Sequence, residues 1–259
     1  MKSHPSSSQS LSQKILNSGY YKIEYNVTNL GGTSTKIDSF IVFENSSLED
    51  FWEVKLKNLQ VKIRKSNAEK VNNQGTFLFL YDKIDRMKSQ VPNWVFDYFT
   101  KTTLWIDDIN KPNSAAAYHP SKEWLVENGY MKEKAKGVEL FNLFNYVDWT
   151  KRAQPDMLLH EYAHAYHDQI MTNGFNNKMI LDAYNKSIAS KKYELVDYIL
   201  GGQVKHYATT NQMEYFAEIT EAYFGKNDMY PFTKNELKSF DTGAYELIEK
   251  IWVTGLKDK

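Results

Sequence analysis

Apolar and polar residues alternate in short stretches of the first half of the chain and recur at helical spacing mainly in the second half. The alternation predicts strands at 20–28, 38–43, 103–106 and 115–118, with another strand or hairpin arm at 138–146. Helical spacing predicts helices at 47–64, 155–171, 177–199, 212–224 and 244–252. Residues 77–90 fit a helix, although their first four residues also suit a buried strand. Strands that come early and helices that come late favour an α+β fold.

The pattern predicts one domain behind a short tail. Residues 1–18 are polar and rich in serine, so we expect a disordered tail there. Residues 19–259 are long enough to bury a sizeable core as a single domain. Within that domain, the part up to about residue 110 is compatible with a subdomain.

Composition narrows the classes of function. The 32 Lys and Arg balance the 32 Asp and Glu, so no excess charge indicates nucleic acid or a membrane surface as a partner. The chain has no cysteine, so any metal must be held by His, Asp or Glu. Aromatic residues make up 15%, which favours aromatic-rich packing over an aromatic-lined cleft. No classical signal peptide or membrane span is evident, so we expect a cytoplasmic protein, with unconventional export as the alternative.

The segment HEYAH at 160–164 carries the clearest chemical signal. It falls within the predicted helix 155–171, so His160 and His164 are one turn apart, with Cβ atoms about 6 Å from each other. Both imidazoles can then reach one tetrahedral zinc at ~2.0–2.1 Å. Glu161 lies about 100° round the helix, where it can accept a proton from the water on the metal. The alternative, two histidines on an ordinary helix, is weakened by the apolar flanks.

The residues that follow HEYAH exclude one class of zinc site. A metzincin would have Gly at 167 and His at 170, whereas this chain has His167 and Ile170. We expect His167 to hydrogen-bond locally and Asp168 to be a solvated acid at the end of the helix. The third metal ligand must therefore be a carboxylate from elsewhere.

Three acids in the predicted helix 212–224 are candidates for that ligand. Glu214, Glu218 and Glu221 share one face of an otherwise apolar helix, and such acids need a cation or hydrogen-bond partners. Asn211 and Glu214 also fit a capping box, which favours Glu218 as the ligand. Helical spacing alone leaves Glu214 and Glu218 open.

Together, HEYAH, Tyr207 and the segment EYFAE at 214–218 resemble the catalytic domain of anthrax lethal factor and its relatives among the gluzincins. In that family a tyrosine precedes the zinc-ligating glutamate by seven residues, and a second glutamate follows it by four. The resemblance implies that Glu214 is the third ligand and that Glu218 supports a zinc-bound histidine. It also implies that Tyr207 stabilises the oxyanion. It covers residues 158–217.

Longer stretches resemble uncharacterised bacterial proteins thought to be metallopeptidases. The similar segments are AYHPSKEWLVENG (117–129), LLHEYAHAYHDQ (158–169) and EYFAEITEAYFGKND (214–228). This resemblance covers about half of the chain, brings no known substrate, and does not extend to the first 100 residues.

The expected protein is thus a zincin-like α+β domain with a small twisted sheet, an active-site helix at 155–171 and a third-ligand helix at 212–224. We expect one Zn²⁺ per chain, held by His160, His164 and Glu214. The expected reaction is hydrolysis of a peptide bond in a peptide or protein substrate, with Glu161 as the base and Tyr207 as the oxyanion donor.

Substrate is expected to bind along an edge strand at 115–118, with Ala116 and Tyr118 contributing by strand addition. Two alternatives stay open from the sequence. One is a zinc hydrolase that acts on a non-peptide amide, and the other is a zincin-fold pseudoenzyme that serves as a binding module. The intact Glu161 argues against the second, because a binding module has no need of a base.

Overall fold

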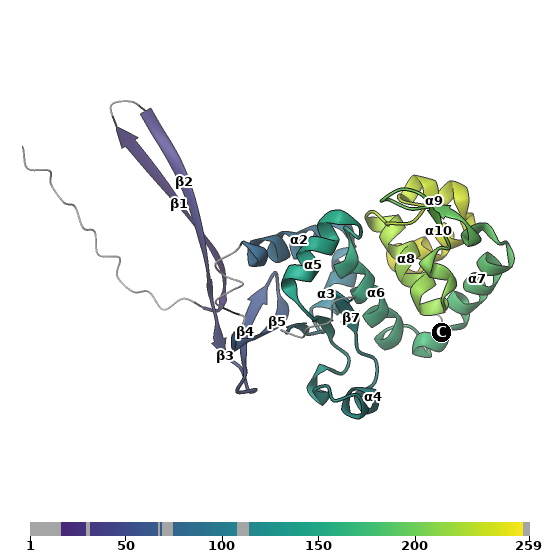
Figure 1. Ribbon diagram of the computed structural model, residues 1–259, viewed down its shortest axis with the longest axis horizontal. Helices are drawn as coiled ribbons and strands as arrows, with labels where there is room; N and C mark the ends of the chain where they lie inside the picture. Colours follow the sequence, from purple (N-terminus) through teal and green to yellow (C-terminus); the bar gives the residue numbers. More distant parts are fainter. Residues whose placement is uncertain (1–16, 30–31, 67, 69–74, 108–113, 256–259) are drawn as a thin grey trace, which may run out of the picture.

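The computed structural model describes residues 17–29, 32–66, 68, 75–107 and 114–255. The tail expected at 1–18 lies almost entirely outside these residues. A long hairpin of β1 (Gly19–Asn29) and β2 (Gly32–Val42) projects from one end of the molecule (Figure 1). The C-terminal helices form the other end, and α6 (Met157–Gln169) lies between them and the central sheet.

The other elements are mostly short. The remaining strands are β3 (Glu44–Asn45), β4 (Phe51–Leu56), β5 (Leu59–Arg64), β6 (Leu104–Ile106), β7 (Ala116–Tyr118), β8 (Val138–Leu140), β9 (Val196–Asp197) and β10 (Gln203–Val204). The remaining α-helices are α2 (Thr76–Gln90), α3 (Asn93–Phe99), α4 (Lys122–Glu127), α5 (Leu143–Arg152), α7 (Lys178–Ala189), α8 (Gln212–Phe224), α9 (Lys234–Phe240) and α10 (Thr242–Ile248). Short 3₁₀ turns are η1 (Lys132–Lys134), η2 (Gly174–Asn176), η3 (Lys192–Glu194) and η4 (Tyr207–Thr209), and the π-helical η5 (Glu249–Val253) continues α10. Within the described residues, no helix has both the length and the apolar character needed to cross a membrane.

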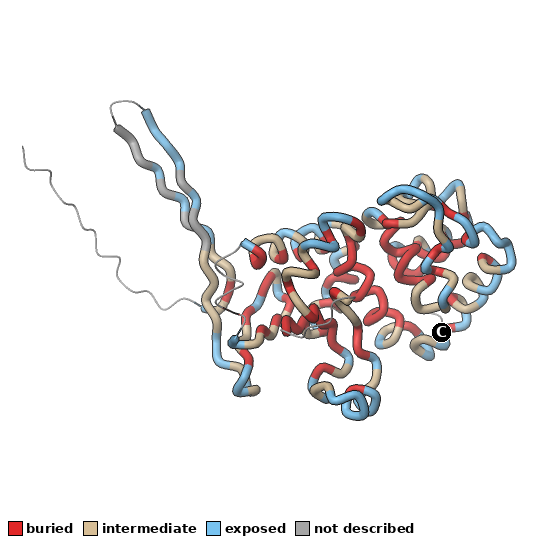
Figure 2. The backbone as a smooth tube through the Cα atoms, viewed as in Figure 1, coloured by how far each residue is buried: buried red, intermediate tan, exposed pale blue. Residues whose placement is uncertain are grey.

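The central sheet joins strands from both halves of the chain. Its order is β3-β4-β5-β6-β8-β7, in which β6 is parallel to β5 and β8 and the other pairs are antiparallel. Strand β7 is at the edge, and α6 packs against β7 and β8. Buried residues are concentrated in the sheet, α6 and α8, whereas much of the projecting hairpin is exposed (Figure 2). One mixed sheet combined with many helices confirms the α+β class.

The helix expected at 47–64 is wrong, because this segment forms the hairpin β4–β5. Every second side chain of β5 is buried, which is the period of a strand. Lys57 and Asn58 form the two-residue turn with φ angles of 51° and 73°. Positive φ at both positions is what a type I′ hairpin turn requires. Since the turn contains no glycine, its signal in the sequence is weak.

Two other predictions need correction. The strand expected at 138–146 ends after three residues as β8, and α5 begins at Leu143. The cause is Asn142, whose side chain accepts the N–H groups of Phe144 and Asn145 at 2.9 and 3.2 Å and so caps the helix. The helix expected at 177–199 is confirmed only in its first part, as α7, and η3 and β9 follow it.

Aromatic side chains fill the core behind α6 and α8. The ring of Trp252 stacks on Tyr166 and on Phe216, with centroids 4.6 and 5.8 Å away, and meets the edge of Phe99 at 5.8 Å. This aromatic-rich packing is the one that the composition favoured. It fixes the two site helices against a common rigid support.

A buried ion network fixes β8 and the end of β7 on the sheet. Lys134 is 1% exposed and donates to Asp107 and to Glu139, each at 2.5 Å. Glu139 in turn hydrogen-bonds His119, the residue directly after β7, at 2.6 Å. Arg64 adds a bidentate contact to Asp107. Because each buried charge has an opposite partner, the network holds the edge strand in place.

Candidate metal centre

The first helix of the site, α6, is anchored at its start. Asp156, which precedes it, accepts two hydrogen bonds from Arg86, at 3.0 and 3.1 Å, and one from the backbone N–H of Lys226, at 2.7 Å. Gly225 lies so close that a Cβ there would be 2.2 Å from the Asp156 carboxylate. Through Asp156, the start of α6 is tied to α2 and to the end of α8.

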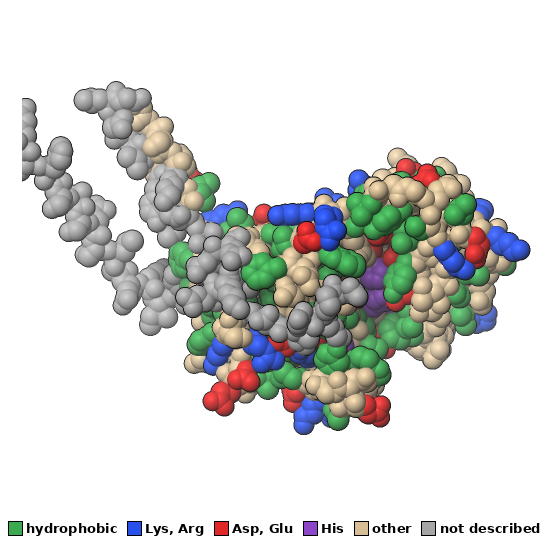
Figure 3. Space-filling model, in the orientation of Figure 1, with side chains coloured by type: hydrophobic (Ala, Val, Ile, Leu, Met, Phe, Trp, Pro, Cys, Tyr) green, Lys and Arg blue, Asp and Glu red, His purple; other side chains and the backbone are tan. Residues whose placement is uncertain are grey.

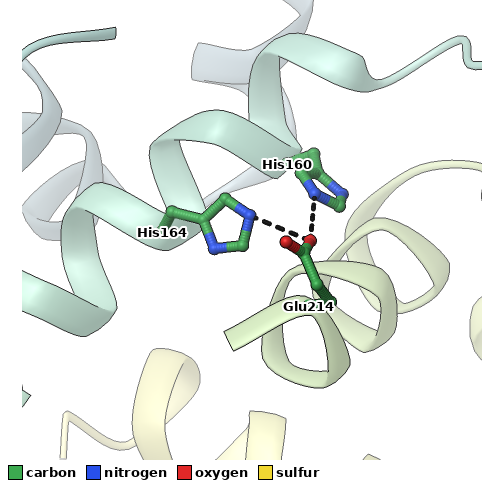
Figure 4. A group of neighbouring side chains, drawn as sticks. All are labelled: His160, His164 and Glu214. Carbon is green, nitrogen blue, oxygen red and sulfur yellow. Dashed lines mark hydrogen bonds and ion pairs between the residues drawn. The ribbon is translucent and has the colours of Figure 1, made fainter. Parts of the chain in front are cut away.

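The second helix, α8, is capped in a way that leaves its first glutamate available. The Asn211 side chain accepts the N–H groups of Met213 and Glu214, both at 2.9 Å. The carboxylate of Glu214 contacts the histidines of α6 instead of completing a capping box with the backbone N–H of Asn211. Its Oε2 lies 3.1 Å from Nε2 of His160 and 3.2 Å from Nε2 of His164 (Figure 4). Of the two glutamates left open by the spacing, Glu214 is the one that meets both histidines.

The acid that supports His160 is Glu221. Nδ1 of His160 is 2.7 Å from Glu221 Oε1, which is hydrogen-bonding distance, but 3.6 Å from Glu218 Oε1, which is too far. Glu218 instead accepts a hydrogen bond at 2.9 Å from the side chain of Asn227. The hydrogen bond to His160 that was expected from Glu218 is made by Glu221, one turn further along the same helical face, while Glu218 lies within ion-pair distance of the same nitrogen. Helical spacing carried this signal, since all three acids shared one face.

The donor atoms fit a zinc ion. Two imidazole Nε2 atoms and one carboxylate oxygen lie within 4.8 Å of one another. In tetrahedral zinc sites with bonds of ~2.0–2.1 Å, neighbouring ligand atoms are about 3.3 Å apart, close to the two distances from Glu214. Moreover, His160 faces a carboxyl group on each ring nitrogen, so without a cation either both nitrogens donate or one of the carboxyl groups carries a proton. A metal on the Nε2 side allows a neutral ring with Nδ1–H on Glu221.

The charges of these groups compensate one another inside the protein. Burial disfavours the charged form of His160, but hydrogen bonds with Glu214 and Glu221 outweigh burial and raise its pKa well above the usual value. Burial likewise opposes ionisation of Glu214, yet its contacts with His160 and His164 hold its pKa well below the usual value. Burial raises the pKa of Glu221 to about 7, although His160 opposes the rise. The cluster is therefore electrostatically suited to a cation.

The side chain of Glu161 extends from α6 to the edge strand β7. Its Oε2 accepts the backbone N–H of Tyr118 at 2.7 Å. The phenol of Tyr118 donates to Asp168 at 2.6 Å, and Lys136 also reaches Asp168 at 2.6 Å. Asp168 is thus a partly buried link between α6 and β7, and the expectation of a solvated acid is wrong. Tyr118 connects the strand to the helix through both its backbone and its side chain.

The register of β7 directs the backbone N–H and C=O groups of two of its residues away from β8. The C=O of Ala115 accepts the N–H of Phe141 at 3.1 Å, and the N–H of His119 donates to the C=O of Gly137 at 3.0 Å, at the two ends of β8. In an antiparallel pair the hydrogen-bonded residues alternate along the strand. The N–H and C=O groups of Ala116 and Tyr118 consequently point away from β8, to the free edge of the sheet.

These residues surround a cavity of about 590 Å³. Histidine side chains are visible in a hollow whose rim carries hydrophobic and acidic side chains (Figure 3). The residues that line it come from α6, α8, β7 and the neighbouring loops. The described ones are Ser114, Ala115, Ala116, Ala117, Tyr118, Pro120, Trp149, Gln154, Met157, His160, Glu161, His164, Phe175, Tyr198, Tyr207, Met213, Glu214, Glu218, Asp228 and Met229. All the residues predicted from the sequence to form the site thus border one cavity, whereas Glu221, which was not predicted as a site residue, is not among its lining residues.

Tyr207 lies at the mouth of this cavity. It is 47% exposed, and its ring stacks near His160 with centroids 6.5 Å apart. The ring nitrogen of His206 accepts the N–H of Ala208 at 3.1 Å and so caps the turn η4 that carries Tyr207. Burial lowers the pKa of His206 to about 3, which keeps this acceptor neutral.

His167 belongs to the core rather than to the site. Its side chain is fully buried between Phe175 and Phe216, with ring centroids 5.1 Å away in each case. Neither ring nitrogen has a hydrogen-bond partner among the described residues, so the expected local hydrogen bond is not formed. Burial lowers the pKa of His167 to about 3.

Sequence reasoning missed Asp228, which lines the cavity from the loop after α8. No periodic signal marks this loop, so only the fold brings the residue to the site. No protein-family model matches the chain, and no curated protein or solved structure is significantly similar to it. The resemblance to gluzincins therefore rests on the motifs HEYAH, Tyr207 and EYFAE and on their spacing.

Proposed function

We propose that this chain is a zinc-dependent metallopeptidase of the gluzincin type, which hydrolyses peptide bonds in peptide or protein substrates. The observation that carries the proposal is the meeting of two Nε2 atoms and a Glu214 oxygen on the floor of a cavity. His160, His164 and Glu214 would hold the ion, and Glu221 would fix the tautomer of His160. Zinc in such a site acidifies a water molecule and polarises a carbonyl.

The protein's own groups supply the proton transfers. Glu161 lies one residue after the first ligand and borders the same cavity, where it accepts the proton of the attacking water and passes it to the leaving amine. Its carboxylate is oriented by the N–H of Tyr118 at 2.7 Å. The hydroxyl of Tyr207 donates to the oxygen on which negative charge develops.

The edge strand suits an extended peptide. Ala116 presents its N–H and C=O to the free edge of the sheet, while the N–H of Tyr118 is already taken by Glu161. A peptide strand that pairs with Ala116 would run past the metal centre, since both line the same cavity. Main-chain pairing of this kind favours peptides over other amides, and it is the reason why we prefer a peptidase.

An experiment on cleavage and metal content tests this function. The protein should bind about one zinc per chain by elemental analysis. It should then cleave members of a proteome-derived peptide library, identified by mass spectrometry. Glu161→Gln should keep the zinc and lose cleavage by at least about 10²-fold, because the amide cannot accept a proton.

The matched control is Glu127→Gln, since Glu127 is an exposed glutamate on α4, outside the cavity. It should leave both zinc content and cleavage unchanged. Cleavage by Glu161→Gln at the wild-type rate would refute the role of the base. Stoichiometric zinc without cleavage of any peptide would refute the peptidase and favour a binding module.

A further inference from the structure

Asp228 lines the cavity, but the proposed reaction gives it no role. It is 9% exposed and follows α8 in the loop that leads to α9. Among the described residues, no other side chain hydrogen-bonds or forms an ion pair with its carboxylate, which accepts only its own backbone N–H. A nearly buried carboxylate that faces a cavity without a partner is costly, and such groups usually face a cation when the site is occupied.

The loop holds this carboxylate in a defined position. The side chain of Asn227 donates to the backbone oxygen and to Oε2 of Glu218, both at 2.9 Å. The C=O of Asp228 accepts the N–H of Ile199 at 2.8 Å, and the N–H of Met229 returns to Asn227 at 3.0 Å. Asp228 is thus held on both sides, and its orientation is part of the fold.

The charge of the cavity also favours a cationic ligand. The described lining contains the acids Glu161, Glu214, Glu218 and Asp228 but no lysine or arginine. A divalent metal ion would compensate Glu214 and Glu161. The carboxylate of Glu218 accepts a hydrogen bond from the side chain of Asn227. The charge of Asp228 is attracted by His160. With a metal ion on Nε2 that ring would be neutral, and the described lining, which contains no lysine or arginine, would then offer Asp228 no opposite charge.

Aromatic rings line the cavity together with Asp228. Trp149 and Tyr198 both belong to its walls. Tyr198 forms a β-bridge with Met229, and the N–H of Ile199 donates to the C=O of Asp228 at 2.8 Å, so the backbone brings Tyr198 and Asp228 side by side. Aromatic faces attract ammonium and guanidinium groups and pack against their aliphatic stems. The wall therefore combines one fixed negative charge with rings that suit a cationic chain.

We propose that Asp228 is a specificity-determining residue, which binds a positively charged group of the substrate close to the scissile bond. This inference rests on the proposed metallopeptidase function and names its substrate class. The charged group is either the side chain of a lysine or arginine or a free N-terminal amine. Both offer the same chemistry to Asp228, so the test must separate them.

The test measures equilibrium binding, so it does not depend on turnover. Hydroxamates bind zinc, and lysine and norleucine have side chains of similar length that end in an ammonium or a methyl group. The zinc-loaded protein is titrated by calorimetry with N-acetyl-lysine hydroxamate, N-acetyl-norleucine hydroxamate and norleucine hydroxamate. The first offers a side-chain cation, the second offers none, and the third offers an α-amine.

At least one of the two cationic ligands should bind about 10- to 100-fold more tightly than N-acetyl-norleucine hydroxamate, as expected for a charged hydrogen bond in a buried site. The tighter ligand identifies the source of the charge. Asp228→Asn should remove the preference while it keeps the affinity for the neutral ligand. Asp197→Asn, which changes an exposed aspartate outside the cavity, should retain the preference.

Two results would overturn the inference in distinguishable ways. Equal affinities of wild type for all three ligands, or an unchanged preference in Asp228→Asn, would refute the role of Asp228 and leave the metal centre intact. Absence of zinc binding, or of any hydroxamate binding to the zinc-loaded protein, would refute the metal centre itself and the inference with it.

Discussion

Replacement of Glu221 by glutamine should weaken zinc binding even though Glu221 does not contact the ion. Glu221 is fully buried, and its Oε1 lies 2.7 Å from Nδ1 of His160. A carboxylate on Nδ1 makes the imidazole a stronger donor at Nε2 and holds the ring in position. The glutamine keeps the size of the side chain and can still accept a hydrogen bond, but it lacks the charge.

The expected loss of zinc affinity differs between Glu221 and Glu218, because only Glu221 is within hydrogen-bonding distance of His160. Loss of such a supporting partner usually lowers metal affinity by about 10- to 100-fold, or about 1.4–2.7 kcal/mol. Glu218 lies 3.6 Å from the same nitrogen, beyond hydrogen-bonding distance. Glu218→Gln should therefore change the zinc affinity by less than about threefold, which corresponds to roughly 0.6 kcal/mol.

Competition with a chromophoric chelator at fixed pH gives the zinc dissociation constants of both variants. Glu246→Gln, at an exposed position on α10, serves as the control and should match wild type. Urea unfolding of the metal-free proteins shows whether each variant keeps the fold. A loss of affinity in Glu218→Gln with none in Glu221→Gln would assign the supporting role to Glu218. No loss in either variant would refute the reasoning from the hydrogen bond.

Three further outcomes are expected. Tyr207→Phe should retain stoichiometric zinc and lower kcat by about 10- to 10³-fold on a verified peptide, since one oxyanion donor is lost; an unchanged kcat would exclude that role. Gly225→Ala should lower the free energy of unfolding by about 1–3 kcal/mol in urea titrations, because the new methyl group collides with Asp156. Asn58→Val should lower it by about 1–2 kcal/mol, since a β-branched residue fits the positive φ of the β4–β5 turn poorly; equal stability of this variant and wild type would contradict the turn assignment.

The parts of the site that a single helix determines were accessible from the sequence. His160 and His164 converge because an α-helix places residues four apart on one face, and α8 has the predicted bounds of 212–224. Spacing alone could not decide among Glu214, Glu218 and Glu221. That choice depends on how α8 is rotated and shifted against α6, which the packing of the two helices determines.

The largest error in the fold also has a physical cause. The segment 47–64 contains apolar residues at spacings that suit a helix, and its hairpin turn at Lys57 and Asn58 has no glycine. Pairing with β3 and β6 in the central sheet decides its structure, and such long-range contacts are invisible to a local pattern. Asp228 was missed for the same reason.

The hydrogen bond between the N–H of Tyr118 and Glu161 has a consequence for how the chain can vary. Successive residues of a strand face opposite directions, so the insertion or deletion of one residue in β7 would turn the N–H of residue 118 toward β8 and leave Glu161 without its donor. Point substitutions of the side chains at 115–117 would leave that alternation intact. Changes of length should therefore be tolerated outside β7, in the neighbouring connections, and not within the strand itself.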